Sequence, residues 1–234
     1  DRQILLEATK NFRSESILRN LTRLIQQSGS IALLEGIETK EQALLAMDVG
    51  VDLVQGFYFA KPSSSLDVIA NGEALVKEIT DFYPHFVSEK ILVKTIQKKG
   101  YEALFDNLQG LQQANEVEQA MLNIAKMSFV KRFFILDSEG YQISDEYSVR
   151  EGDEAHQDVL KQGKGLCWKN RRYFIKAQLR PGDLYVSKPY RSIIDVELCL
   201  TISKMIRTAD GQAFVACYDV YYHDKSTASV QISI

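Results

Sequence analysis

The sequence predicts an α/β region followed by an α+β domain, with long helices joining them. Helical and strand patterns alternate in residues 1–81 in the order α-β-α-β-α, which is typical of parallel α/β architecture. Apolar residues recur every three or four positions in residues 82–127, which is helical spacing. Residues 128–226 carry β-rich runs separated by turn signals and indicate an antiparallel sheet with helices on one side. We expect residues 227–234 to be a tail.

Composition excludes several classes of protein. Hydrophobic residues make up 45% of the 234 residues and charged residues 25%, which argues against a disordered, collagen-like or disulfide-scaffold protein. The formal net charge of -3 gives no basic field for nucleic acid or anionic lipid, so we expect no nucleic-acid partner. No apolar run approaches the roughly 18 residues needed to span a membrane. Three cysteines without a CxxC pair are typical of reduced thiols in a cytoplasmic protein.

The first region has recognisable helix boundaries. Gly29 suits the position that stops the first helix, and Thr39 followed by Gln42 is a capping-box pattern. Residues 31–34 are apolar throughout, as expected for a parallel strand covered on both faces. The expected elements are a helix over 4–27, a strand over 31–34, a helix over 40–49, a strand over 51–54 and a helix over 66–83.

The helical stretch over 84–127 has two interpretations. It is either a connector that packs on its own neighbours or a helix pair that joins two subunits, which would make the protein a homodimer. Its apolar pattern is not regular enough for a coiled coil. The elements expected after it are strands over 129–136 and 141–144, a helix over 168–179, a strand over 184–190, and strands over 196–206 and 212–222 around a hairpin at 209–211.

Two polar residues follow the two predicted parallel strands. Glu35 ends the first apolar run and Gln55 ends the second. Because ligands of α/β proteins bind beyond the carboxyl ends of parallel strands, this repeated placement favours a site. The alternative is that Glu35 only caps the following helix.

These residues lie in two motifs, Glu35-Gly36-Ile37-Glu38-Thr39 and Gln55-Gly56-Phe57-Tyr58-Phe59-Ala60-Lys61-Pro62. Both motifs and their spacing resemble the closing part of the EAL domain, the cyclic-di-GMP-specific phosphodiesterase. The resemblance implies part of a (β/α)₈ barrel, hydrolysis of cyclic di-GMP to linear pGpG, and Mg²⁺ or Mn²⁺ as cofactor. It assigns Glu35 as a catalytic metal ligand and places Gln55 by the catalytic water and substrate.

Other parts of the EAL pattern are absent from the sequence. The Glu-Ala-Leu motif, an asparagine, a second glutamate and paired aspartates have no match. A barrel of this class also needs about 200–250 residues to close. We therefore expect the chain to be the C-terminal portion of an EAL protein and to be inactive alone. The alternative is a non-catalytic cyclic-di-GMP receptor or an interaction module.

The last region is similar to PAS and Cache sensor domains, and the whole order resembles EAL proteins with a cytoplasmic PAS-like C-terminal domain. That resemblance implies an unknown small-molecule signal bound between the sheet and a helical layer. Arginine can pair with a carboxylate, aspartate can hold an amine, and tyrosine gives an apolar wall with a polar tip. The alternative is that the aromatic residues are core and the arginines are solvated. The candidate pocket residues are Trp168, Arg172, Tyr173, Tyr185, Tyr190 and Asp219.

Overall fold

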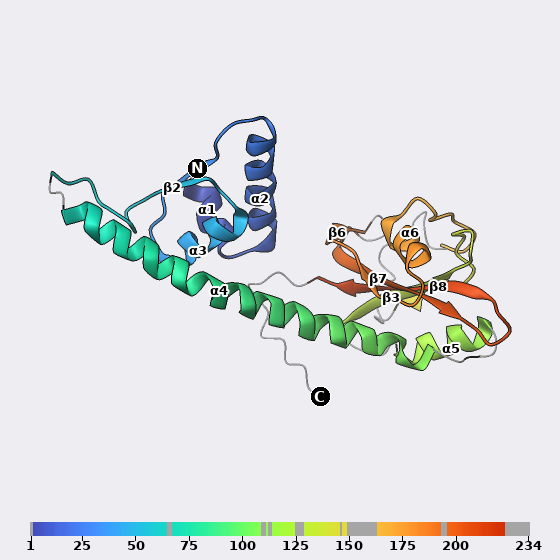
Figure 1. Cartoon of the computed structure of the whole chain (residues 1–234). Coiled ribbons are helices and arrows are strands. Elements are labelled where there is room, and N and C mark those ends of the chain that lie inside the picture. Colours follow the sequence, from blue (N-terminus) through green and yellow to red (C-terminus); the bar gives the residue numbers. More distant parts are fainter. Residues whose placement is uncertain are drawn as a thin grey trace. The chain divides into compact units, whose positions relative to one another are not determined.

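The computed structural model describes residues 2–64, 67–108, 111, 114–124, 129–145, 147–148, 163–192 and 196–222. These residues form two compact units, one within residues 1–95 and the other within residues 96–222. Helix α4 (Asp67–Glu102) belongs to both (Figure 1). The predicted tail over 227–234 lies outside the described residues.

The first unit is an α/β arrangement with a parallel strand pair, as predicted. Its elements before α4 are α1 (Arg2–Ala8), α2 (Phe12–Gln27), β1 (Leu33–Glu35), α3 (Lys40–Val49) and β2 (Leu53–Gln55). The single helix expected over 4–27 is divided into α1 and α2. Asn11 has extended backbone angles and its side chain accepts a hydrogen bond from the Ser14 amide at 2.8 Å, so it caps a new helix.

Helix α3 has the bounds that its sequence predicts. The Thr39 hydroxyl accepts from the Gln42 amide at 3.3 Å, and the Gln42 side chain accepts from the Thr39 amide at 3.2 Å. Gly50 ends the helix with φ of 83°, a left-handed conformation that favours glycine. Local sequence chemistry therefore fixes both ends of this element.

The prediction that the first strand is covered on both faces is wrong for the described chain. Ala32 and Leu34 are buried, but Leu33 and Leu53 keep 47% and 54% of their surface exposed. The core of this unit lies between its helices and one side of the strands. Two paired strands cannot close into a barrel, and no closed barrel is present among the described residues.

Helix α4 joins two helices that the sequence analysis separates. It runs through Pro84 without ending, and the Ser88 hydroxyl donates to the Pro84 carbonyl at 2.8 Å. An interior proline removes one backbone donor and crowds the carbonyl four residues earlier, so its cost is local, and α4 continues past it for 18 residues to Glu102.

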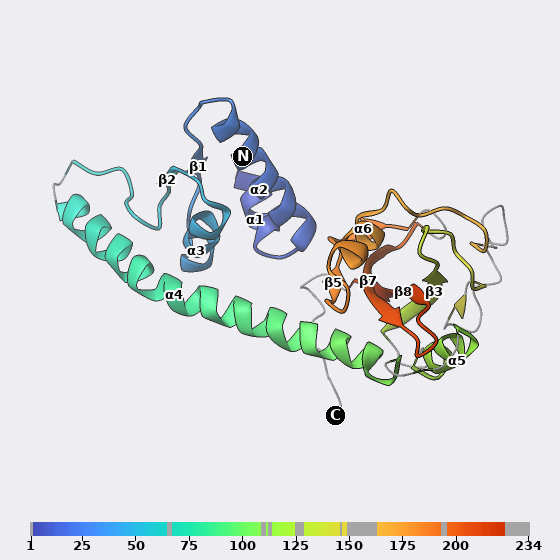
Figure 2. The same ribbon diagram turned by 45° about the vertical axis from the view of Figure 1, so that its right-hand side comes forward.

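The second unit is built on an antiparallel sheet of six strands. Its elements are η1 (Ala103–Leu108), α5 (Ala114–Ile124), β3 (Val130–Leu136), β4 (Tyr147–Ser148), α6 (Arg172–Leu179), β5 (Tyr185–Val186), β6 (Tyr190–Arg191), β7 (Leu198–Arg207) and β8 (Ala213–Tyr221). The strand order is β4-β3-β8-β7-β5, with β6 paired to β7. Figure 2 labels β5, β7, β8 and β3 of this sheet. Gly211, with φ of 88°, lies in the predicted hairpin between β7 and β8.

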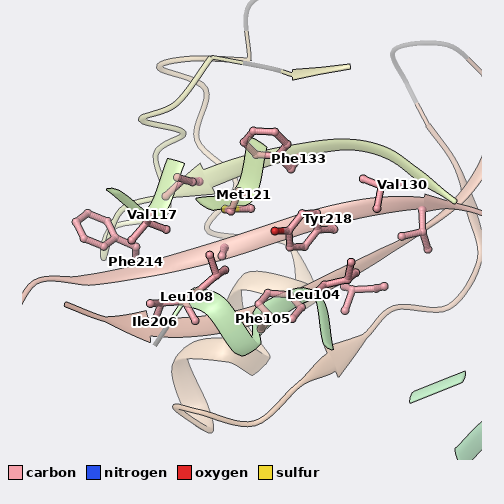
Figure 3. Packing of buried hydrophobic residues seen from close by; sticks show 14 of the residues in the cluster. Leu104, Phe105, Leu108, Val117, Met121, Val130, Phe133, Ile206, Phe214 and Tyr218 are labelled. Atoms are coloured by element: carbon pink, nitrogen blue, oxygen red, sulfur yellow. The ribbon is translucent and has the colours of Figure 1, made fainter. Parts of the chain in front are cut away.

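Helical segments cover both faces of this sheet, so the expectation of helices on one side is wrong. Residues of η1 and α5 pack on one face around Tyr218 (Figure 3). Residues of α6 pack on the other face against Phe134 and Met205. Every residue of β3 is buried, which a sheet with one open face would not allow.

The segment before α6 is not helical, although the sequence predicts a helix from residue 168. The Trp168 amide donates to the Gly140 carbonyl at 2.7 Å, which ties this segment to the turn after β3. A Cβ on Gly140 would lie 2.8 Å from the Cβ of Lys169, so only glycine permits this approach.

Candidate functional site

The first candidate site is a hollow at the carboxyl ends of β1 and β2. Glu35 and Gln55 are register partners at the ends of these parallel strands, as their spacing predicts. The hollow has a volume of about 540 Å³. It is lined by Glu35, Gly36, Glu38, Gln55, Gly56, Phe57, Ala60, Lys61 and Pro62.

Two glycines shape the segments that follow these strands. Gly36 has φ of 80°, and a Cβ on Gly56 would lie 2.0 Å from the Ile37 carbonyl oxygen. The Ile37 amide donates to the Gln55 carbonyl at 3.1 Å, and the Tyr58 amide donates to the Ile37 carbonyl at 2.9 Å. These bonds hold the two segments together, so glycine is needed where their backbones touch.

The polar side chains of this hollow face solvent. Glu35 and Gln55 are both exposed, and neither side chain is hydrogen-bonded within the described part of the chain. Glu38 is held by Arg2 at 2.8 Å. No three His, Cys, Asp or Glu residues come together as a metal cluster among the residues described. These residues by themselves therefore do not fit a two-metal centre, because hard cations take six or more oxygen ligands.

The second candidate site is a pocket of about 520 Å³ beside α6 in the second unit. All six pocket residues predicted from the sequence line it, from Trp168 to Asp219. Their role in binding a ligand stays a prediction. The other described lining residues are Arg132, Phe134, Gln142, Arg171, Val186, Ser187, Lys188, Pro189, Arg191 and Ser192.

A buried polar row crosses three strands at this pocket. Asp219 of β8 is in register with Arg132 of β3 and with Thr201 of β7. Its carboxylate accepts from Arg132 Nε at 2.9 Å, from the Thr201 hydroxyl at 2.7 Å and from the Tyr190 hydroxyl at 3.3 Å. The side chains of Arg132 and Asp219 are 4% and 6% exposed, so this ion pair is almost fully removed from water.

Arg132 is the residue that the sequence analysis misses. The available signal is the pair Lys131-Arg132 inside an otherwise apolar β run, where a charge needs a buried partner. That partner, Asp219, lies 87 positions later in the chain. Only strand pairing brings the two residues together.

Burial dominates the electrostatics of the pocket. It raises the pKa of the Asp219 carboxyl above its ordinary value, while Arg132, Thr201 and Tyr190 act in the opposite direction. It also raises the pKa of the Tyr173 and Tyr190 hydroxyls, which therefore stay protonated at neutral pH. The hydroxyl of Tyr190 is available as a hydrogen-bond donor to Asp219.

Aromatic side chains form the walls, and the indole nitrogen of Trp168 is hydrogen-bonded. Trp168 Nε1 donates to the Gln142 side chain at 3.1 Å, and the Arg171 guanidinium lies 5.6 Å from the Trp168 ring centre. Tyr173 belongs to the core beneath α6 and also lines the pocket. For this residue, a place in the core does not exclude a place in the pocket wall.

In the described part of the chain, no helix combines the length and the apolar composition that crossing a bilayer requires.

Comparison with known proteins confirms the EAL resemblance for the first unit. Residues 1–62 match the family model of the EAL domain. Among curated proteins the chain has no match. The fold resembles that of the Bacillus subtilis YkuI protein, which has an EAL domain and was crystallised with substrate c-di-GMP and calcium. The TM-score is 0.65 with 21% identity over 89% of this chain and 53% of that chain.

The YkuI match extends over both units of this chain, and this chain spans about half the length of YkuI. A second similar structure is the ligand-binding domain of the Campylobacter jejuni chemoreceptor Tlp3 with 4-methylisoleucine, with a TM-score of 0.45 and 16% identity over 64% of this chain and 59% of that chain. A third is an extracellular ligand-binding receptor from Desulfohalobium retbaense, with a TM-score of 0.40 and 8% identity over 87% of this chain and 50% of that chain.

Proposed function

We propose that this chain is the C-terminal regulatory portion of a cyclic-di-GMP signalling protein of the EAL phosphodiesterase family. The observation that carries the proposal is the placement of Glu35 and Gln55 side by side at the ends of two parallel strands, inside the segment that matches the EAL domain. The fold shared with YkuI, which was crystallised with c-di-GMP, supports the same ligand. In this proposal the second unit is a PAS/Cache-like sensor for a small molecule.

Glu35 and Gln55 have different roles in this proposal. Glu35 is one oxygen ligand of a Mg²⁺ or Mn²⁺ ion, and Gln55 orients water and substrate. Glu35 is exposed at a strand end, and its carboxylate has no side-chain partner among the described residues. Such a carboxylate suits a metal ion whose other oxygen ligands come from outside these residues. The described residues supply only this part of the site, so we propose that they are inactive without the rest of an EAL domain.

The test is release of linear pGpG by the intact protein with Mg²⁺ or Mn²⁺. Glu35→Ala should lower turnover on the order of a hundredfold or more, because loss of even an indirect metal contact costs up to about that much. Glu89→Ala changes an exposed carboxylate on α4, outside the hollow, and serves as the control. Undiminished turnover in Glu35→Ala would remove Glu35 from the mechanism.

A non-catalytic cyclic-di-GMP receptor is the second candidate. It is favoured by one observation, that the described residues bring no group of three metal-ligating side chains together. Calorimetry of the intact protein with cyclic di-GMP separates the two functions. Binding with no pGpG product, in the presence of either metal ion, supports the receptor and contradicts the phosphodiesterase.

We also propose that the protein is a homodimer joined through α4. Ile91, Leu92 and Ile96 are apolar and between 48% and 59% exposed on this helix, which favours a partner helix. Sedimentation of the protein should show a dimer that Leu92→Glu dissociates, and Lys94→Glu on the same helix is the matched control. A wild-type monomer at micromolar concentration contradicts this part of the proposal.

A further inference from the structure

We infer that the outer face of α6 docks on the surface of an anionic lipid bilayer. This inference goes beyond the proposed function. It is carried by an excess of positive charge around the helix, by the lack of ion pairs that would neutralise this charge among the described residues, and by two apolar side chains exposed among the basic ones.

Positive charge is concentrated around α6, although the chain as a whole is acidic. Residues 164–191 contain eight basic residues and one acidic residue, Asp183, while the formal net charge of the whole chain is -3. The expectation of no basic field therefore holds for the whole chain but not for this segment. All eight basic residues are exposed, so their field reaches a polyanion at the surface. They are Lys164, Lys169, Arg171, Arg172, Lys176, Arg180, Lys188 and Arg191.

The helix places three of these charges along its outer face. Its buried residues lie between Tyr173 and Ala177 and pack against the sheet. Arg172 and Lys176 are one turn apart, and Arg180 is the C-cap residue one turn further on, so the three lie on the opposite face. Figure 1 shows α6 on the outside of the second unit, with the sheet between it and α5.

This charge is not neutralised within the described part of the chain. In the first unit, Arg19 and Lys90 contact the Asp48 carboxylate at 2.6 and 2.7 Å. By contrast, no basic residue in 169–191 forms an ion pair with a described residue. Glu139 is exposed in the turn that contacts α6 and adds only one carboxylate near it. Like charges gathered on one face repel each other, so an anionic partner is stabilising there.

Two apolar side chains on the same face favour a bilayer over other polyanions. Ile175 is 40% exposed and Leu179 is 69% exposed. The outer face of a single helix is convex, whereas peptides are held in grooves or at strand edges. Nucleic acid is bound mainly through its phosphates, which have no use for an exposed leucine. At a bilayer surface, basic side chains meet anionic headgroups while apolar side chains between them enter the acyl boundary.

Co-sedimentation of the intact protein with lipid vesicles tests the inference. The vesicles contain phosphatidylcholine alone or phosphatidylcholine mixed with phosphatidylserine. The protein should bind only the vesicles with phosphatidylserine, and added salt should weaken this binding because the charges are exposed. Equal binding to both kinds of vesicle, or no binding to either at low salt, overturns the inference. Binding to duplex DNA without binding to vesicles overturns it as well.

The double variant Lys176→Gln/Arg180→Gln locates the contact, because both residues are exposed and outside the pocket lining. Each removed charge should weaken binding to the phosphatidylserine vesicles about fivefold. The control Arg23→Gln/Lys94→Gln removes the same charge from exposed positions on α2 and α4 and should leave binding nearly unchanged. Equal affinities of the two double variants contradict a contact through α6.

The variant Leu179→Ser separates apolar insertion from charge, since it changes no charge and replaces an exposed side chain at the end of α6. Loss of the inserted side chain should weaken vesicle binding about fivefold. An unchanged unfolding midpoint shows that the variant is folded. Unchanged vesicle binding in Leu179→Ser contradicts the insertion of α6 into the bilayer surface.

Discussion

The two candidate sites of this chain differ in how far they are complete. At the ends of β1 and β2, Glu35 and Gln55 are exposed and unpaired within the described residues. In the second unit, Asp219 and Arg132 are buried and bonded to each other and to neighbouring hydroxyls. Exposed polar groups cost little without a partner, whereas buried ones are costly unless they are satisfied. The first site can therefore remain incomplete in the folded unit, whereas the hydrogen bonds and ion pair of the second site must form when its unit folds.

The largest effect that tests this comparison should come from Asp219→Ala. Removing one partner of a buried ion pair costs about 3–5 kcal/mol, because the remaining charge is left in the interior. Chemical denaturation of the protein measures the loss in the second unit. Asp183→Asn changes an exposed aspartate near the same strands and should stay within about 0.5 kcal/mol. A loss below about 1 kcal/mol in Asp219→Ala would mean that the row is not needed for folding.

A smaller loss is expected from Gly56→Ala. The added Cβ would lie 2.0 Å from the Ile37 carbonyl oxygen, so the backbone beside the first hollow must shift. The expected cost is more than about 1 kcal/mol. Gly100→Ala is the matched control, since nothing lies within 4 Å of its Cβ and it is inside α4, where alanine should stabilise by about 0.5–1 kcal/mol. Equal unfolding midpoints for the two variants would contradict the close approach.

Arg19 on α2, Asp48 on α3 and Lys90 on α4 form an ion-pair cluster that joins these helices. We expect the Asp48 side chain to contribute about 1–2 kcal/mol to stability at neutral pH, and less in acid. Burial alone raises the pKa of Asp48, but hydrogen bonds from Lys90 at 2.7 Å and Arg19 at 2.6 Å lower it by more, so its pKa lies below the ordinary value. Asp48→Asn should destabilise the first unit at neutral pH. Since the wild-type stabilisation is lost as the pH falls through the lowered pKa, the difference should shrink below about pH 4.

Denaturation curves of wild type and Asp48→Asn at a series of pH values measure this difference. A difference that stays constant from pH 7 to pH 3 would show that the Asp48 charge contributes nothing. Arg23→Gln on α2 lies outside the cluster and should show no such dependence.

The smallest change in stability is expected for Glu35→Ala. An exposed, unpaired side chain at a strand end should contribute less than about 0.5 kcal/mol. The same variant is expected to lose turnover in the intact protein, so the first site would matter for function and not for folding. A stability loss above about 1 kcal/mol would place Glu35 in a structural role and remove this contrast with Asp219.

Sequence reasoning predicts the first candidate site from local rules and the second by resemblance. Glu35 and Gln55 were found from their place after apolar strands, and the structure shows them as register partners. The six pocket residues were found by resemblance, and the structure gathers them around one pocket. Arg132 was missed because its meaning depends on Asp219, which lies far away in the chain.

The sequence by itself determined the elements whose ends depend on local chemistry. The capping box at Thr39 and the left-handed Gly50 fixed α3, and the glycine turn fixed the hairpin between β7 and β8. Only the tertiary structure decided that α4 runs through Pro84, that helices cover both faces of the sheet, and that Arg132 meets Asp219. Capping and turn residues act within a few positions, whereas burial and buried charge pairing depend on contacts between distant segments.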